Sequence, residues 1–356
     1  MNVSKKAFDV NRLGQTVHSF ELSNNQGMTV VILDRGATIH SIRVPDRDGK
    51  PGEVTLACGS VKQYEASGAY FGAIAGRYAN RIAKGRLTVD GQPLQLACNN
   101  GENHLHGGES GFDDKLWQAG FSSTEDQCSL TLCYQSEDGE EGYPGALKVK
   151  VEYVLTDANE LSVRYQAETD KTTVVNLTNH TYFNLRGKGS CREHRLQINA
   201  KYYTPVDATS IPYGDIVPVE GTPMDFTVMK TIGQDLDTAF DQLQQAGGYD
   251  HNWVFRKDQA QPAEPVSAAM VEEQETGRTL EVLTTHPGMQ FYSGNFLAGE
   301  AGRGGHTYQK QDGFCLETQH FPDSPNHPQF PSTELKPGEL YQHQTVFRFG
   351  VTSSSS

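Results

Sequence analysis

Residues 147–167 read LKVKVEYVLTDANELSVRYQA, and this stretch decides the fold class. Val149, Val151 and Tyr153 alternate with their neighbours at a period of two, which is typical of a half-buried β-strand. A second β-rich run begins at Leu161, after the four residues DANE. The stretch therefore predicts two consecutive β-strands.

The same pattern occurs elsewhere in the chain. Residues 28–44, MTVVILDRGATIHSIRV, are rich in β-branched side chains and are broken once, at Gly36. Residues 86–97, RLTVDGQPLQLA, place Asp90 and Gly91 between two alternating runs, and such a pair is a strong signal for a β-hairpin. Short strands separated by turns are thus the dominant pattern along the sequence.

One stretch favours a helix, because its apolar residues recur at helical spacing before a pair of glycines, Gly247 and Gly248, that would end the helix. The residues of this apolar stripe are Ile232, Leu236, Ala239, Phe240 and Leu243. The sequence as a whole predicts an all-β fold with few short helices, in which sheet packs on sheet as a large antiparallel β-sandwich, or closes into a barrel. We expect a single domain over residues 1–350 and a polar tail over residues 351–356, because no linker or internal repeat interrupts the chain.

Composition excludes several classes of protein. The 356 residues carry 30 Lys and Arg against 44 Asp and Glu, a net charge of −14, which disfavours binding to nucleic acid. No apolar run approaches the roughly 18 residues needed to span a membrane, and the N-terminus does not resemble a secretory signal. The six cysteines are scattered without a CxxC pair, so we expect free thiols in a cytoplasmic protein.

Polar residues gather in five segments that a closed core would avoid. These are residues 76–82, 103–108, 176–185, 248–253 and 315–327. If residues 174–185 are extended, one strand face carries amides, hydroxyls and His180. Amides, charged groups and aromatic rings together favour a site for a ligand with many hydroxyl groups, such as a sugar. No segment has the glycine spacing of a phosphate or dinucleotide loop, so we expect no nucleotide cofactor.

Individual residues also have simpler interpretations. His180 on a strand could be an ordinary hydrogen-bonding residue, and Asp250 could belong to a turn. His104 and His106 could share a metal ion, but no third ligand is indicated, so we expect no metal. Glu317 stands in an apolar strand, where a carboxylate without a partner is costly. It is therefore the strongest candidate for a functional role on residue type alone.

Six motifs, in order along most of the chain, make the sequence similar to the aldose 1-epimerase family, the galactose mutarotases. They are GRYANRI (76–82), NHLHGGESGFDDKLW (103–117), TNHTYFNL (178–185), GYDHNW (248–253), PGMQFYSGN (287–295) and ETQHFPDSPNHP (317–328). The resemblance implies a β-sandwich with an open groove, and interconversion of the α and β anomers of free hexoses such as galactose and glucose. It implies neither a metal nor a nucleotide.

The resemblance also assigns roles to residues. Glu317 matches the family's general base and His180 its general acid. The positions that bind the sugar are matched by Asn80, Arg81, His106, Asp250 and Gln290. The partner is then a small-molecule sugar, and we expect a monomer or a weak homodimer.

Three other functions remain open at this stage. A hexose-6-phosphate epimerase would need cations at the sugar's C6 end, for which Arg77, Arg186 and Lys115 are candidates. A glycoside hydrolase would use Glu317 and Asp250 as its pair of carboxylates. A non-catalytic carbohydrate-binding protein would need the binding residues but not the pair of His180 and Glu317.

Overall fold

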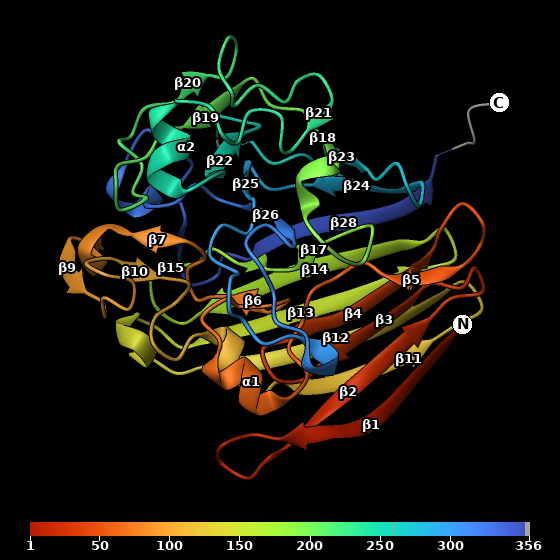
Figure 1. The fold of residues 1–356 in the computed structure, drawn as a ribbon. Helices are drawn as coiled ribbons and strands as arrows, with labels where there is room; N and C mark the ends of the chain where they lie inside the picture. Colours follow the sequence, from red (N-terminus) through yellow and green to blue (C-terminus); the bar gives the residue numbers. More distant parts are fainter. Residues whose placement is uncertain (259, 353–356) are drawn as a thin grey trace.

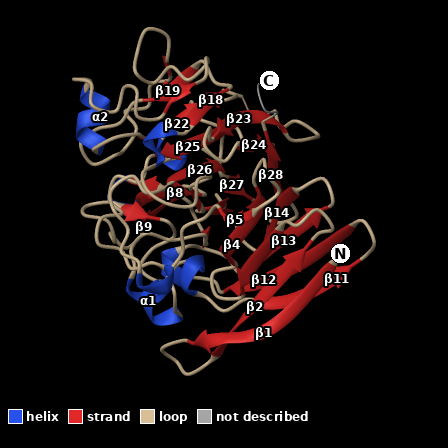
Figure 2. Ribbon diagram, turned by 45° about the vertical axis from the view of Figure 1, so that its right-hand side comes forward, coloured by secondary structure: helices blue, strands red, loops and turns tan. Residues whose placement is uncertain are grey.

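The computed structural model describes residues 1–258 and 260–352, which form antiparallel sheets joined by long loops (Figures 1 and 2). The largest sheet contains the predicted pair of strands as β13 and β14, with Leu155 opposite Leu161. Its order is β11-β12-β13-β14-β28-β24-β23-β18-β21. The bounds are β11 (Gln118–Ser123), β12 (Gln127–Ser136), β13 (Leu147–Thr156), β14 (Glu160–Thr169), β28 (Tyr341–Val351), β24 (Arg278–Thr284), β23 (Val266–Glu272), β18 (Arg195–Ile198) and β21 (Lys230–Thr231).

A second sheet, from the N-terminal part of the chain, lies beside strands β11 to β14 (Figure 1). It runs in chain order through β1 (Asn2–Val10), β2 (Thr16–Ser23), β3 (Thr29–Leu33), β4 (Thr38–Pro45) and β5 (Pro51–Glu53). Apolar side chains from both sheets, such as Phe20 and Val30 from one and Leu132 and Val151 from the other, belong to one buried cluster. The expected sheet-on-sheet packing is therefore confirmed.

The third sheet positions the functional site. Its order is β17-β26-β25-β22-β19-β20, with bounds β17 (Tyr182–Phe183), β26 (Phe314–Gln319), β25 (Gly288–Tyr292), β22 (Asp250–Val254), β19 (Tyr202–Thr204) and β20 (Val217–Pro218). Every residue of β25 and β26 is buried. Phe291 and Leu316 join the apolar core, while Gln290 and Glu317, one position along each strand, lie opposite each other on the other face. The alternation of side chains along β25 and β26 therefore places a carboxylate within a buried layer of polar residues.

Four short strand pairs complete the description. They are β6 (Ile74–Ala75) with β16 (Thr178–Asn179), β7 (Arg81–Ile82) with β10 (His104–Leu105), β8 (Arg86–Val89) with β9 (Gln92–Gln95), and β15 (Thr173–Val174) with β27 (Glu334–Leu335). The hairpin predicted at Asp90 and Gly91 is confirmed. Both residues have positive φ, 48° and 72°, which matches the right-handed twist of the two strands they join.

The predicted helix is wrong over most of its length. Within the described residues the α-helices are α1 (Val61–Ala66), capped by the Ser60 side chain and not predicted, and α2 (Asp241–Ala246). Ile232 instead follows strand β21, and its backbone N–H donates to the His194 carbonyl beside β18. Ile232 and Leu236 are buried from turns, Ala239 is exposed and Phe240 is half-buried. The predicted end of the helix is confirmed, because Gly247 closes α2 with φ 69°.

Single turns of 3₁₀ helix occur at Ala83–Gly85, Phe112–Asp114, Glu140–Gly142, Cys191–Glu193, Arg303–Gly305 and Ser324–Asn326. None of the described helices has the length and apolar character needed to cross a bilayer. All six cysteines are free, as predicted. The tail expected over residues 351–356 begins later than predicted, because β28 includes Val351; residues 353–356 lie outside the described part of the chain.

Candidate active site

A cavity of about 300 Å³ opens beside strands β22 and β26. It brings together six of the seven residues singled out in the sequence, from five separate stretches of chain: Asn80, Arg81, His106, His180, Asp250 and Glu317. Glu317, Asp250 and Arg81 come from β26, β22 and β7, and the other three come from loops next to β7, β10 and β16. The polar motifs of the sequence therefore converge on one concave site.

Glu317 is the most deeply placed charged group of this site. Its side chain is 3% exposed, and its Oε2 atom has no hydrogen-bond partner among the described residues. Burial raises the pKa of Glu317 well above its ordinary value, and the negative charge of Asp250 adds to this effect; the positive charge of Arg81 acts in the opposite direction. Such an unpartnered, buried carboxyl group is costly in a folded protein and is typical of a group that binds a ligand.

His180 approaches Glu317 from the loop that directly follows the short strand β16. Its backbone is held on both sides, because its N–H donates to the Ala73 carbonyl and its own carbonyl accepts from the N–H of Gly72. The distance between His180 Nε2 and Glu317 Oε1 is 3.6 Å, which is too long for a hydrogen bond. Burial lowers the pKa of His180 to about 4.

These two shifts have a common consequence. Burial disfavours the ionised form of each group, so it stabilises the neutral pair, a carboxylic acid and a neutral imidazole, relative to carboxylate and imidazolium. The two forms hold the same number of protons. A ligand that accepts a proton from His180 and donates one to Glu317 converts the ionised pair into the neutral pair. The arrangement is therefore chemically able to exchange two protons with one ligand.

Asn80 and His106 hold each other in place across the cavity wall. The backbone N–H of Asn80 donates to Nδ1 of His106, and the backbone N–H of His106 donates to the Asn80 carbonyl, each at 3.0 Å. Both residues have positive φ, 66° and 48°. Because Nδ1 accepts a hydrogen bond, the neutral ring carries its proton on Nε2 and offers that N–H as a donor. Strained backbone of this kind is characteristic of functional sites.

Arg81 and Asp250 supply opposite charges at the cavity wall. Their nearest atoms, Arg81 Nη1 and Asp250 Oδ2, are 3.9 Å apart, and Arg81 Nε donates to Asn100. Gln290 is placed differently from the other predicted residues. It does not line the cavity, and its amide Nε2 donates to Asp250 Oδ1 at 2.8 Å, so it orients Asp250.

The cavity also contains residues that were not singled out as site residues. Tyr292 lies two residues after Gln290 on one strand and therefore shares its face. This alternation was the one signal in the sequence that could have identified Tyr292 as a site residue. The others lie in loops or, like Tyr182, on a segment whose side chains do not follow simple alternation: Tyr70, Asn100, Tyr182, Phe296 and Glu300. Loop residues of this kind reach the cavity only through the tertiary fold.

The polar face expected along residues 174–185 is largely structural. The segment is broken into separate short strands instead of one long strand. The Asn176 amide bonds the Ala79 and His320 backbone, and the Asn184 amide bonds the carbonyls of Gly189 and Asp312. These amides satisfy buried backbone groups, which explains why polar residues are required there.

Two groups of three side chains bring possible metal ligands together. The first, His106, His180 and Glu317, belongs to the cavity itself. His106 would have to bind through Nε2 with a proton on Nδ1, and that proton would meet the donated N–H of Asn80. His104 faces away, toward Ala97 and Tyr143. The metal site considered from the sequence at His104 and His106 is therefore wrong.

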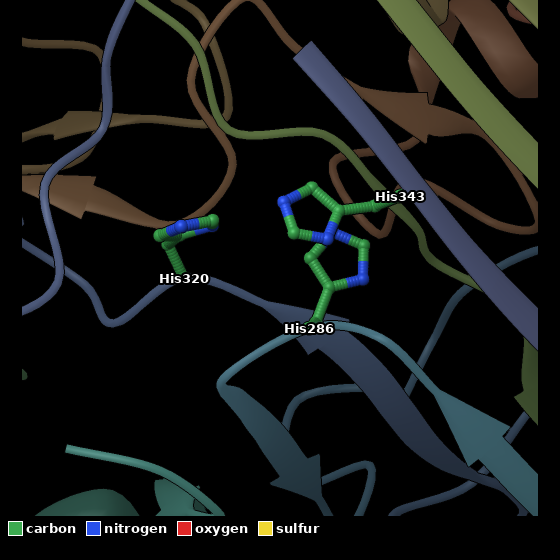
Figure 3. Close-up of side chains that lie close together, drawn as sticks. All are labelled: His286, His320 and His343. Carbon is green, nitrogen blue, oxygen red and sulfur yellow. The ribbon is translucent and has the colours of Figure 1, made fainter. Parts of the chain in front are cut away.

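The second group is His286, His320 and His343, which is buried in a different part of the molecule (Figure 3). The rings of His286 and His343 are stacked, with centroids 4.1 Å apart and planes inclined by only 15°. A metal ion lies in the plane of each imidazole that binds it, so two nearly parallel, stacked rings cannot point at one ion. The ring nitrogens of His286 also contact the hydroxyls of Thr284 and Tyr341. This arrangement fits a packed cluster better than a metal centre.

Comparisons with known proteins identify the family to which the whole chain is similar. The family described as aldose 1-epimerase matches residues 18–348. The chain is 47% identical to the galactose mutarotase of Rattus norvegicus, over 95% of each chain, and 42% identical to the aldose 1-epimerase of Escherichia coli (strain K12), over 94% of this chain and 96% of that relative. A crystal structure of galactose 1-epimerase from Lactobacillus acidophilus superposes with a TM-score of 0.86 at 29% identity, covering 99% of this chain and 100% of that one.

The charge of Asp250 gives a first prediction. We expect Asp250→Asn to lower the pKa of Glu317, because the substitution removes a neighbouring negative charge and leaves Arg81 free to act on Glu317 alone. The measurement is a pH titration of the side-chain carboxyl carbons by ¹³C NMR. The matched control is Asp207→Asn, in a turn outside the cavity. An unchanged or higher pKa for Glu317 would contradict the electrostatic account.

Proposed function

This chain belongs to the aldose 1-epimerase family and is an isomerase that interconverts the anomers of free aldoses, and we propose that Glu317 and His180 carry the proton transfers of this reaction. One observation supports the proposal above the others. A carboxyl group on strand β26 and an imidazole from the loop after β16 face the same small cavity, with 3.6 Å between their nearest atoms.

The chemistry of anomers requires such a pair. In a cyclic aldose the C1 hydroxyl oxygen and the ring oxygen are bonded to the same carbon, so a base for one and an acid for the other must also lie close together. Glu317 as carboxylate removes the proton of the C1 hydroxyl, while His180 as imidazolium protonates the ring oxygen. The bond between C1 and the ring oxygen breaks and an open-chain aldehyde forms.

The second half of the reaction reverses these roles. Rotation about the C1–C2 bond turns the other face of the aldehyde toward the C5 hydroxyl. His180 then removes the proton of that hydroxyl as the ring closes, and Glu317 returns a proton to the C1 oxygen. The pair is neutral while the aldehyde exists and ionised while the ring is closed. Because burial stabilises the neutral pair, it favours the ring-opened state inside the cavity.

The remaining cavity residues hold the sugar. Arg81 and Asp250 present a donor and an acceptor to hydroxyl groups, and the Nε2 donor of His106 and the amide of Asn80 add further hydrogen bonds. Gln290 supports this set by fixing Asp250. Aromatic rings of Tyr70 and Phe296 line the same cavity and suit the C–H faces of a sugar.

We also propose that residues 1–350 form one domain that works in the cytoplasm as a monomer or weak homodimer. One apolar cluster that extends in sequence from Phe20 to Phe349 supports the single domain. Six free thiols are consistent with a reducing compartment. The proposed steps transfer protons and break and re-form one C–O bond without any change of oxidation state, so they call for no redox cofactor.

Substitution of the two reacting groups tests the assignment. We expect Glu317→Gln and His180→Asn each to reduce the rate of mutarotation by about 10²–10⁴-fold, the usual contribution of a general acid or base. The rate is followed by polarimetry of freshly dissolved α-galactose and α-glucose. Glu220→Gln and His306→Asn, exposed and outside the cavity, are the matched controls and should retain wild-type rates. Wild-type activity in a folded variant of either reacting residue would contradict its role.

The charge of the cavity argues against a phosphorylated substrate. Among the described residues, Arg81 is the one Lys or Arg that lines the cavity. The same cavity is lined by three acidic residues, Asp250, Glu300 and Glu317. The cations considered from the sequence lie elsewhere. Arg77 is buried against the Pro144 and Gly145 carbonyls, Arg186 pairs with Glu273, and Lys115 pairs with Glu140.

We therefore expect kcat/KM for glucose 6-phosphate to be about a hundredfold lower than for glucose, because an extra dianion beside three acidic side chains costs about 3 kcal/mol. Relaxation of the two α-anomers can be compared by polarimetry or NMR at one ionic strength. Glucose carrying a neutral O-methyl group at C6 is the control for size. Equal rates for glucose and its 6-phosphate would overturn this preference.

A further inference from the structure

Cys315 is a buried thiol that contacts the proposed acid and to which the mechanism above gives no task. Its Sγ atom lies 3.6 Å from Nδ1 of His180, within the range of a hydrogen bond that involves sulfur. This is its single side-chain hydrogen bond within residues 1–258 and 260–352, and the thiol is fully buried.

The strand register creates this contact. Cys315 and Glu317 are two residues apart on β26 and therefore project on the same face. The pairing of Tyr182 with Cys315 brings the chain that carries His180 next to them. One strand thus places a group at each nitrogen of the imidazole, with Glu317 near Nε2 and Cys315 near Nδ1.

The proposed reaction determines which nitrogen must keep its proton. Nε2 faces Glu317 and the cavity, so it is the nitrogen that gives a proton to the ring oxygen and takes one back. After it has given that proton, the neutral ring must carry its remaining proton on Nδ1. A ring with the opposite tautomer, with a proton on Nε2 and none on Nδ1, could not take up the proton of the C5 hydroxyl.

We propose that Cys315 is a positioning residue whose sulfur accepts the Nδ1–H of His180 and so keeps Nε2 as the nitrogen that exchanges protons with the sugar. This inference rests on the proposed function of His180. Sulfur is a weak acceptor, which suits a ring that must alternate between neutral and charged forms. A carboxylate at the same place would favour the imidazolium throughout the cycle.

The surroundings of the thiol agree with this role. Burial and the negative charges of Glu317 and Asp250 raise the pKa of Cys315 well above its ordinary value, so it stays a neutral thiol. The other groups that face His180 are the rings of Tyr70, Tyr182 and His106, with centroids 5.1–5.9 Å from that of His180. Burial lowers the pKa of His180, and a hydrogen bond from its ring to its own backbone carbonyl acts in the opposite direction. This carbonyl and the sulfur therefore both favour a proton on Nδ1.

Two variants of Cys315 test the proposal. Cys315→Ala removes the acceptor and Cys315→Ser restores a polar one of similar size. Cys128→Ala removes a buried thiol in strand β12, which belongs to a different sheet and does not line the cavity. We expect Cys315→Ala to lower kcat about three- to tenfold, the usual effect of losing one weak hydrogen bond, with little change in KM. Cys315→Ser should recover most of the loss, and Cys128→Ala should keep the wild-type kcat.

Two further readouts separate positioning from simple packing. Loss of the acceptor removes a stabilising contact of the imidazolium, so the alkaline limb of the kcat profile should move to lower pH in Cys315→Ala. Long-range ¹H–¹⁵N NMR of histidine rings, assigned with His180→Asn, should show the Nδ1–H tautomer of His180 in the wild type and in Cys315→Ser, and a mixture in Cys315→Ala.

The outcomes are distinguishable from failure of the proposed function. If His180→Asn keeps full activity, the role of His180 fails, whereas the tautomer measurement still reports directly on the contact. The proposal for Cys315 is overturned if wild-type His180 carries its proton on Nε2. It is also overturned if Cys315→Ala loses thermal stability but keeps the wild-type kcat and pH profile.

Discussion

The buried carboxyl group of Glu317 is the constraint on which the rest of the site depends. A carboxylate in the centre of a fully buried strand is unfavourable unless a partner or a ligand compensates it. Here the compensation is incomplete: Arg81 lowers the cost of the charge, but Asp250 raises it, and one oxygen has no hydrogen-bond partner among the described residues. In the loops that line the same cavity, Asn80 and His106 have positive φ.

The balance between two protonation states follows from that burial. In water, a carboxylate and an imidazolium would be the stable pair near neutral pH. Inside the cavity the neutral pair gains stability relative to the ionised pair, since neither group is well solvated. The same feature that costs folding free energy thus matches the pair to a reaction in which both groups change charge together. The net charge of the chain, −14, has little part in this, because only three acidic side chains line the cavity.

Much of the fold could be predicted from the sequence where the signal is local. Alternation over residues 147–167 and the turn at Asp90 and Gly91 each predicted strands that the structure contains. The prediction of a helix over residues 232–243 was wrong because apolar residues that are buried from a series of turns can have the same spacing as the apolar face of a helix. The interpretation of Asn176 and Asn184 as ligand-binding residues was wrong. Their amides bond buried backbone groups, and a sequence cannot show which polar side chains do so. The motifs predicted the set that meets at the cavity, but the place of Gln290 behind Asp250, and of Cys315 behind His180, depends on strand register.

The most direct test of the central claim, that Glu317 and His180 act on the two oxygens of one carbon, is a crystal structure of the Glu317→Gln protein with galactose bound. The account predicts the ring oxygen within about 3 Å of His180 Nε2 and the C1 oxygen within about 3 Å of the side chain at position 317, as hydrogen bonds require. A sugar bound in this cavity with its C1 end turned away from both side chains, toward Arg81 and Asp250, would contradict it.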